Sequence, residues 1–551
     1  MRGAPGKTVA TLAMTMTMTM MEDPGASRAE RCRSLSHGTG AVPVFALALA
    51  VLLPGCASLP SLEGRTATTA LADTSGTRIG RALAADAAAN PGKTGIHPLA
   101  DGEAAFAARV VLAAAAERSI DAQYYIWHGD QAGYLMFEAL WRAAQRGVRV
   151  RLLLDDLNTG GLDPTIAALD AHPYIEVRLY NPLAQRTVRS LNFLTDFSRV
   201  NRRMHNKSFT VDNQVSIVGG RNVANEYFGA GSGVMFADLD VIAVGAAVPE
   251  VSRAFDLYWN SPSAYPAAGL VGRPDPDGAA ALEATFAATR ADAESVAFIE
   301  AVRATTIVRD MLDLRLAFDW NVARVVYDDP AKTLDTTERT DILLFPDLVR
   351  AMGRPERAFD LVSPYFVPGD EGTEVLAAEA RRGVKVRILT NSLATSEASV
   401  VHAGYAKRRE ALLRAGIQLY ELKPTAERAS GQAKAKHGSG SSSAALHAKT
   451  FAVDRERMFV GSFNFDQRSA RLNTEMGIVI DNPKFARQLA ERFDVQGPLV
   501  AYEVRLRPDG GLEWIERTAT GEARYDTEPQ SSGFRRFSVE LLSIFPIDWM
   551  L

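Results

Sequence analysis

The hydrophobic positions of this 551-residue chain follow one long pattern twice. In the first half, the apolar run SIDAQYYIW (119–127) precedes a stretch with helical periodicity, and RGVRVRLLLDDL (146–157) comes after it. In the second half, FDLVSPYFVP (359–368), another helical stretch and RGVKVRILTNSL (382–393) follow in the same order. Two β-rich runs joined by a helix that ends at Arg-Gly predict a β-α-β unit with parallel strands.

The repeat extends through a further strand into a polar motif. The predicted strands are IEVRLYNPL (175–183) and IQLYELKP (417–424). MHNKSFTVDNQVSIVGGRNVAN (204–225) then matches LHAKTFAVDRERMFVGSFNFDQ (446–467) in its His, Lys, Asp, glycine turn and Asn. Matches at this many positions indicate a duplicated domain.

We therefore expect an α/β fold with two tandem domains. The Pro/Gly-rich segment SPSAYPAAGLVGRPDPDG (261–278) favours a boundary between the two copies. The expected first domain is 100–265, the linker is 266–289 and the second domain is 290–551.

Residues 1–55 are expected to be a secretory signal with an over-extended start. The apolar run Ala41–Leu53 follows three arginines between residues 28 and 33, and it is too short for a comfortable membrane span. It ends in Leu-Pro-Gly-Cys, which resembles a bacterial lipobox with Cys56 as the lipidated residue. The alternative is an ordinary signal or an uncleaved anchor helix.

Residues 56–99 are rich in Ser, Thr, Ala and Gly, and we expect them to form a flexible tether. A lipidated Cys56 would attach the protein on the periplasmic side of a bacterial cell envelope. The two residues after Cys56 lack the Asp that often retains a lipoprotein at the inner membrane, which favours the outer membrane.

Charge and cysteine content narrow the classes of function. The 61 Lys and Arg residues are balanced by 65 Asp and Glu residues, giving a net charge of -4, so nucleic acid is not an expected partner. The only cysteines, Cys32 and Cys56, precede every segment that is expected to fold. No disulfide framework is predicted.

The candidate chemistry lies in two copies of the motif His-x-Lys-x-x-x-x-Asp. The copies are His205, Lys207 and Asp212, and His447, Lys449 and Asp454. Residues two apart on a strand point to the same face, so His and Lys share one face and the Asp side chain lies on the other, where it braces the site.

Asn222 and Asn464 follow the glycine-containing turns, and their amides suit phosphoryl oxygens. Neither motif has the clustered ligand spacing of a metal site, so no metal or other cofactor is expected.

The paired motifs resemble those of the phospholipase D superfamily, over nearly all of the chain after the expected tether. The Ser-Ile-Asp-Ala-Gln-Tyr-Tyr opening, the lipobox-like start and the terminal LLSIFPIDWML are similar to bacterial C-type cardiolipin synthases and phospholipase D-like lipoproteins. The resemblance implies two α-β-α sandwich domains related by a pseudo-twofold axis, with both motifs in one active-site cleft.

The resemblance also implies covalent catalysis. One histidine, taken as His205, attacks phosphorus to form a phosphohistidine, while His447 serves as acid and then base. Which histidine is the nucleophile stays open. The two lysines and two asparagines would stabilise charge on the phosphoryl oxygens.

A histidine in this role needs a partner that fixes its tautomer, and the family supplies an acid downstream of each motif. Carried over to this chain, Glu475 is expected to orient His205, and Asp238 is expected to orient His447. An insertion in the first half makes Asp240 a rival for Asp238.

The leading hypothesis is a phosphatidyltransferase that makes cardiolipin from phosphatidylglycerol, phosphatidylethanolamine or both. Its substrates would be phospholipids, and the sequence says nothing of an accessory protein. Hydrolysis to phosphatidic acid uses the same chemistry, and the sequence does not distinguish it from transfer. A nuclease is disfavoured by the charge balance and the anchor, and an inactive lipid-binding lipoprotein is disfavoured because both motifs are intact.

Segment 183–203 interleaves arginines with large apolar residues just before the first motif. It is either a solvated loop with buried apolar anchors or a rim that meets phospholipid headgroups and acyl chains.

Overall fold

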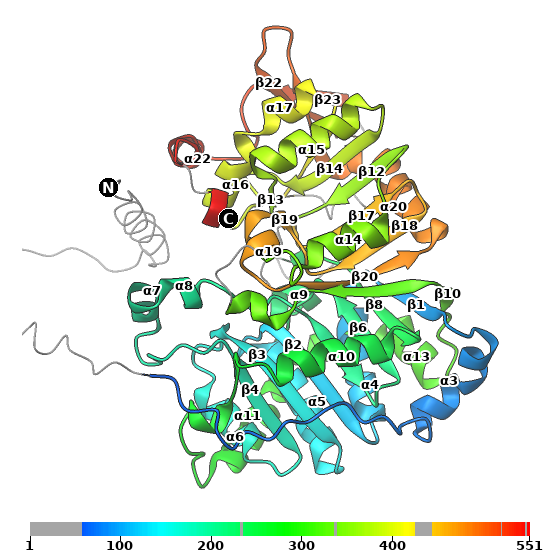
Figure 1. Ribbon diagram of the computed structural model, residues 1–551, viewed down its shortest axis with the longest axis vertical. Coiled ribbons are helices and arrows are strands. Elements are labelled where there is room, and N and C mark those ends of the chain that lie inside the picture. The colour runs from blue at the N-terminus through cyan, green and yellow to red at the C-terminus, as the bar shows by residue number, and fades with distance from the viewer. Residues whose placement is uncertain are drawn as a thin grey trace, which may run out of the picture. The chain divides into compact units, whose positions relative to one another are not determined.

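The computed structural model describes residues 58–551 apart from 232–234, 335–338, 425–443, 519–520, 546–547 and 551 (Figure 1). The predicted signal segment and Cys56 lie outside the described residues. Within the described ranges, no helix is both long and apolar enough to cross a bilayer.

The first sheet has nine strands in the order β10-β1-β8-β6-β5-β2-β3-β4-β9. Their bounds are β1 Thr94–Leu99, β2 Ser119–Ile126, β3 Arg149–Asn158, β4 Ile175–Tyr180, β5 Ser208–Val211, β6 Val215–Gly219, β8 Asp240–Gly245, β9 Ala264–Pro266 and β10 Asp319–Asn321. Strands β2, β3 and β4 are parallel, as the repeat predicts.

The second sheet has ten strands in the order β11-β20-β18-β17-β12-β14-β15-β21-β22-β23. Their bounds are β11 Ala323–Tyr327, β12 Ala358–Val362, β14 Lys385–Asn391, β15 Gln418–Leu422, β17 Lys449–Val453, β18 Arg457–Gly461, β20 Met476–Asp481, β21 Ala501–Leu506, β22 Leu512–Thr518 and β23 Gly521–Tyr525. The order from β11 to β21 repeats the order from β1 to β9, with β12, β14 and β15 parallel.

The two β-α-β crossovers end their helices in the same way. Helix α5 (Gln131–Gln145) is followed two residues later by Gly147 with φ +87°, and helix α15 (Gly369–Arg381) is followed two residues later by Gly383 with φ +93°. A residue without Cβ adopts this left-handed conformation at low cost, so the Arg-Gly pairs stop both helices. The predicted crossovers are confirmed.

Helices cover both faces of each sheet. Around the first sheet these are α3 Arg78–Ala89, α4 Gly102–Ala115, α6 Asp163–Asp170, α10 Val248–Trp259, α11 Gly278–Ala291, α12 Ala293–Ala304 and α13 Thr306–Leu312. Around the second they are α14 Leu344–Met352, α16 Ser399–Ala406, α17 Arg409–Arg414, α19 Gln467–Arg471, α20 Pro483–Val495, α21 Gly497–Val500 and α22 Gly533–Ser543. The result is two α-β-α sandwiches, as expected (Figure 1).

The expected linker and domain boundaries are wrong. Helices α11 to α13 pack on the first domain, because Leu282, Phe286 and Ile307 join its core cluster. Strand β10 then pairs with β1 in the first sheet. The first domain therefore continues to about residue 321, and the second begins with β11.

The expected tether at residues 56–99 is also wrong over most of its length. Strand β1 belongs to the first sheet. Ahead of it, the Arg65 guanidinium donates to the backbone oxygens of Ser261 at 2.6 Å and Ala264 at 2.7 Å. The backbone oxygen of Thr68 in turn accepts from buried Arg151 at 2.9 Å. A buried guanidinium needs acceptors, and this segment supplies them.

Apolar residues of the two domains pack together in a shared core cluster. One cluster joins residues of β1 and β8, with Ile96 and Val241 among them, to residues of β18 and β20, with Val460 and Ile478 among them. A short parallel pairing also joins β7 (Met235–Ala237) of the first domain to β16 (Ala444–Leu446) of the second. This interdomain pairing brings the second motif to the first domain.

Candidate active site

His205 lies in the loop before β5 and is held by the second domain. Its backbone N–H donates to the Thr474 oxygen at 2.8 Å. Its Nδ1 lies 2.8 Å from Oε2 of Glu475, the residue that was expected to orient it. The side chain is buried.

His447 has the reciprocal arrangement. It follows β16, and its backbone N–H donates to the Ala237 oxygen of the first domain at 2.9 Å. Its Nδ1 lies 2.6 Å from Oδ2 of Asp238, the other expected contact. Each motif histidine is thus positioned by backbone and a carboxyl group from the opposite domain.

The rival Asp240 is engaged elsewhere. Its carboxylate forms a buried ion pair with Arg109 at 2.9 Å and lies 3.5 Å from the Arg221 guanidinium. Those contacts assign it to the core of the first domain.

Both motif lysines fold back onto their own histidines. Lys207 Nζ donates to the His205 oxygen at 2.5 Å, and Lys449 Nζ donates to the His447 oxygen at 2.5 Å. Lys449 Nζ also lies 3.0 Å from Nδ1 and 3.1 Å from Nε2 of His447. The expected strand placement is wrong for both histidines and for Lys207, since β5 begins at Ser208 and β17 begins at Lys449.

Burial and positive charge keep both imidazoles neutral. Burial, then the charges of Lys207 and Lys449, holds the pKa of His205 well below its usual value. Burial and Lys449 lower the pKa of His447 to about 3, although Asp238 opposes them. Because Lys449 acts on His205 and Lys207 acts on His447, both motifs belong to one electrostatic site.

The two orienting carboxyl groups differ. Burial raises the pKa of Glu475 to about 7, against the opposing effects of Lys207 and the hydroxyl groups of Ser462 and Ser469. The pKa of Asp238 is about 2, because His447 and Lys449 outweigh the cost of its burial. At neutral pH, Asp238 is ionised while Glu475 titrates.

The hydrogen bonds around the two carboxyl groups differ as well, although those to Glu475 oppose the rise in its pKa. Glu475 accepts from Ser462 Oγ at 2.5 Å and from Ser469 Oγ at 2.7 Å. Asp238 accepts from the Leu239 N–H at 2.7 Å. At Gly220, which matches Ser462 in the repeat, a Cβ atom would lie 2.2 Å from Asp238 Oδ1. Only glycine leaves room for this carboxylate.

The motif aspartates brace the scaffold, but they do so from the turns just after β5 and β17, with φ +50° and +55°, and not from the strands on which their placement was predicted. Asp212 accepts from the backbone N–H groups of Glu117 at 3.0 Å, Arg118 at 2.7 Å and Ser119 at 2.9 Å. Asp454 makes the matching bonds to residues 356–358. Both carboxylates fix the start of the strand next to the motif strand, β2 in one domain and β12 in the other.

The two asparagines differ in their surroundings. Asn222 Oδ1 accepts from the Ile126 N–H at 3.1 Å, and Nδ2 donates to the Tyr227 hydroxyl at 2.8 Å. Asn464 is buried, and its Oδ1 has no hydrogen-bond partner among the described residues. A contact with phosphate needs the Nδ2 donor, and in Asn222 that donor is already bonded to the Tyr227 hydroxyl group.

Aromatic rings beside the histidines were missed by the sequence interpretation. Tyr125 packs edge-on against His205, with ring centroids 5.0 Å apart. Tyr227 packs edge-on against His447 at 5.0 Å, and Phe236 stacks on the same ring at 5.2 Å. Tyr125 lies in β2, the first strand of the repeated β-α-β unit, which is the signal that could have found it.

The arginines of segment 183–203 are paired within the protein. Arg203 is buried against Asp155 at 2.6 Å, and Arg186 lies 2.8 Å from Asp156 and 2.5 Å from Asp163. Ion pairs of this kind leave these two arginines little freedom to bind headgroups.

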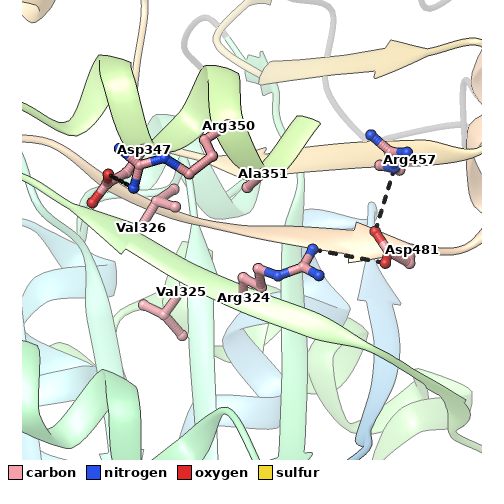
Figure 2. Close-up of a pocket in the computed structure, with 8 residues that line it drawn as sticks. All are labelled: Arg324, Val325, Val326, Asp347, Arg350, Ala351, Arg457 and Asp481. Carbon is pink, nitrogen blue, oxygen red and sulfur yellow. Dashed lines mark hydrogen bonds and ion pairs between the residues drawn. The ribbon is translucent and has the colours of Figure 1, made fainter. Parts of the chain in front are cut away.

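Two other features of the described residues could hold a ligand. A cavity of about 500 Å³ lies between β11, β18, β20 and α14 (Figure 2). Its Arg324 and Arg457 approach Asp481 at 3.7 and 3.8 Å, and no motif residue lines it. Separately, donor atoms of His128, Asp130 and Glu226 lie within 4.8 Å of one another, a spacing that could hold a cation.

Comparison with known proteins decides the family. The family model described as "Cardiolipin synthase, PLD-like domain" matches residues 111–257 and 348–496. The chain belongs to this family. One matched segment lies in each half of the repeat, so the duplicated phospholipase D-like fold is confirmed.

Several family members are similar over most of the chain. "Cardiolipin synthase C" of Escherichia coli (strain K12) is 46% identical, over 84% of this chain and 97% of the relative. "Cardiolipin synthase A" of Pseudomonas aeruginosa (strain PAO1) is 27% identical, over 72% of this chain and 65% of the relative. Among solved structures, a phosphatidylserine synthase of Haemophilus influenzae covers 86% of this chain at 13% identity, with a TM-score of 0.51, and supports the fold.

Proposed function

We propose that the chain is a phosphatidyltransferase that makes cardiolipin from phosphatidylglycerol, phosphatidylethanolamine or both through a phosphohistidine. The observation that carries the proposal is the reciprocal pair His205–Glu475 and His447–Asp238, each formed between domains. The 46% identity to "Cardiolipin synthase C" over 97% of that relative supports the lipid class.

The first step forms the covalent intermediate. Nε2 of neutral His205 attacks the phosphorus of the donor lipid, since Nδ1 faces Glu475. The bond from phosphorus to the headgroup oxygen breaks, and His447 gives that oxygen a proton. The bound phosphodiester anion offsets the lysine charges that depress the pKa of His447, so substrate binding favours its protonated form.

The second step returns the site to its starting state. His447, now neutral, takes the proton from a hydroxyl group of the acceptor lipid. The acceptor oxygen attacks phosphorus, and the bond from phosphorus to His205 breaks. Lys207 and Lys449 stabilise the charge on the non-bridging oxygens in both steps.

We further propose that Cys56 is lipidated and holds the enzyme on the periplasmic side of the envelope, with the outer membrane favoured. The lipobox-like Leu-Pro-Gly-Cys supports this placement. Mass spectrometry of the protein from membranes tests it, because a mature chain that begins at acylated Cys56 is expected and an unmodified Cys56 would contradict it.

The function is tested by incubating purified protein with labelled phosphatidylglycerol, with and without phosphatidylethanolamine. Labelled cardiolipin is the expected product. If phosphatidic acid is the only product, the enzyme is a hydrolase and not a transferase. DNA cleavage without lipid turnover would reject both the transferase and the hydrolase.

A further inference from the structure

Strongly exposed apolar side chains lie on or next to two helices, one from each domain. On α22 of the second domain, Phe534 is 69% exposed and Phe537 is 60% exposed, and Ile544 just after the helix is 75% exposed. In the first domain, Leu194 on helix α7 (Asn192–Thr195) is 69% exposed. We call these four residues the apolar rim.

Helix α22 is held beside the pocket that contains His447. Its buried face packs Val539 and Leu542 against Ala403 and Ala406 of α16. Arg535 donates to the Ser396 backbone oxygen. Glu397, the residue after Ser396, lines the pocket together with His447.

The residues after α22 continue toward His205. Phe545 packs with Val400 and Val401 of α16, and Asp548 forms an ion pair with Arg408 at 3.0 Å. The Met550 oxygen then accepts from Arg468 Nε at 3.1 Å.

Arg468 links this C-terminal segment to the first domain. It donates to the Asn201 oxygen at 2.9 Å, at the end of helix α8 (Phe197–Val200), which follows α7. The charge of Arg468 also acts on His205. Figure 1 shows α7 and α8 of the first domain and α22 of the second domain on the same side of the structure.

We propose that the apolar rim docks the enzyme onto a lipid bilayer and sets the site against the headgroup layer. A bilayer is the favoured occupant because the proposed substrates lie in one and because the rim is split between the two domains that together form the site. Phe534 and Phe537 are three residues apart on one helical face, which suits shallow insertion. This inference rests on the proposed function.

The test uses mature protein purified from membranes and reconstituted into vesicles of phosphatidylglycerol and phosphatidylethanolamine. The variant F534S/F537S/I544S is compared with a control, L312S/V495S, which removes side chains of 68% and 66% exposure on α13 and α20. Turnover is measured on the vesicle lipid and on a short-chain phosphatidylglycerol below its micelle concentration.

We expect turnover of vesicle lipid by the rim variant to fall at least fivefold, while its turnover of the short-chain lipid stays at the wild-type value. Both activities of the control variant should also stay at wild-type values. A smaller loss on vesicles overturns docking. An equal loss on both substrates also overturns it, because the helix would then act through the fold.

A second measurement needs no turnover, so it separates docking from the proposed function. A fluorescent label on Phe534→Cys is expected to be quenched by spin-labelled lipids at least threefold more than the same label on Leu312→Cys. Equal quenching rejects docking, and quenching without turnover of either lipid rejects the proposed function alone.

Discussion

Glu475 of the second domain lies 2.8 Å from Nδ1 of His205 of the first domain, and its pKa is raised to about 7. The equivalent contact of His447 is made by Asp238, whose pKa is about 2. The two halves of the site are alike in geometry and different in charge, and this difference leads to several predictions.

The two histidines should have separable roles. His205→Ala and His447→Ala should each lower kcat at least 1,000-fold, on the order of the loss when a nucleophile or an acid/base is removed. Phosphatidyl-enzyme should accumulate in His447→Asn, where the intermediate forms slowly and breaks down more slowly, and should be absent from His205→Asn. The label retained on each variant protein is measured, and a phosphohistidine is recognised by its lability to acid. Label on His205→Asn and none on His447→Asn would make His447 the nucleophile.

The pH profile of kcat/KM should be narrow. Glu475 is ionised above its pKa of about 7 and then holds the Nδ1 proton of His205, so activity should rise through pH 7. Burial lowers the pKa of Lys449 to about 8, and above that pH its positive charge is lost, so activity should fall. In Lys449→Arg the alkaline limb should move above pH 10, since arginine stays charged; an unmoved limb would remove Lys449 from the assignment.

Ser462 should tune Glu475 rather than hold the fold. Its hydroxyl donates to the carboxyl group at 2.5 Å and favours the ionised form. In Ser462→Ala the acid limb should therefore move to higher pH, by about one unit for one lost hydrogen bond to a charged group. Asp238→Asn is the matched comparison, because it should lower activity without moving that limb.

Gly220→Ala should be far more damaging than Ser462→Ala, although the two positions match in the repeat. The new methyl group would lie 2.2 Å from Asp238 Oδ1 and would push that carboxylate away from His447. We expect kcat to fall at least 100-fold, as when a catalytic group is displaced by about 1 Å. A Gly220→Ala enzyme with near-normal kcat would show that Asp238 is not needed at this position.

The motif aspartates should matter for stability more than for chemistry. Asp212→Ala leaves three backbone N–H groups without their acceptor, which should cost about 1–3 kcal/mol of unfolding free energy. Asp454→Ala should cost less, because Asp454 is partly exposed and water can replace it. Denaturant melts measure the loss, and activity per folded molecule should stay within about threefold of wild type.

The duplicated pattern predicted the two α/β domains, their parallel crossovers and the motif residues. Strand parity separated His205 and Lys207 from Asp212, although all three lie outside β5 itself. The boundaries were less predictable. Composition favoured a tether at 56–99 and a linker at 266–289, but β1 and α11 to α13 pack on the first domain through contacts distant in sequence.

The sequence by itself determined which groups carry the chemistry, because motif spacing and repetition are local properties that need no folded chain. Only the tertiary structure decided how each group behaves. Glu475 and Asp238 are both carboxyl groups beside a motif histidine. Burial raises the pKa of one, although two hydroxyl groups oppose it, while contact with His447 and the charge of Lys449 lower the pKa of the other. Burial and distance between groups remote in sequence exist only in the folded protein.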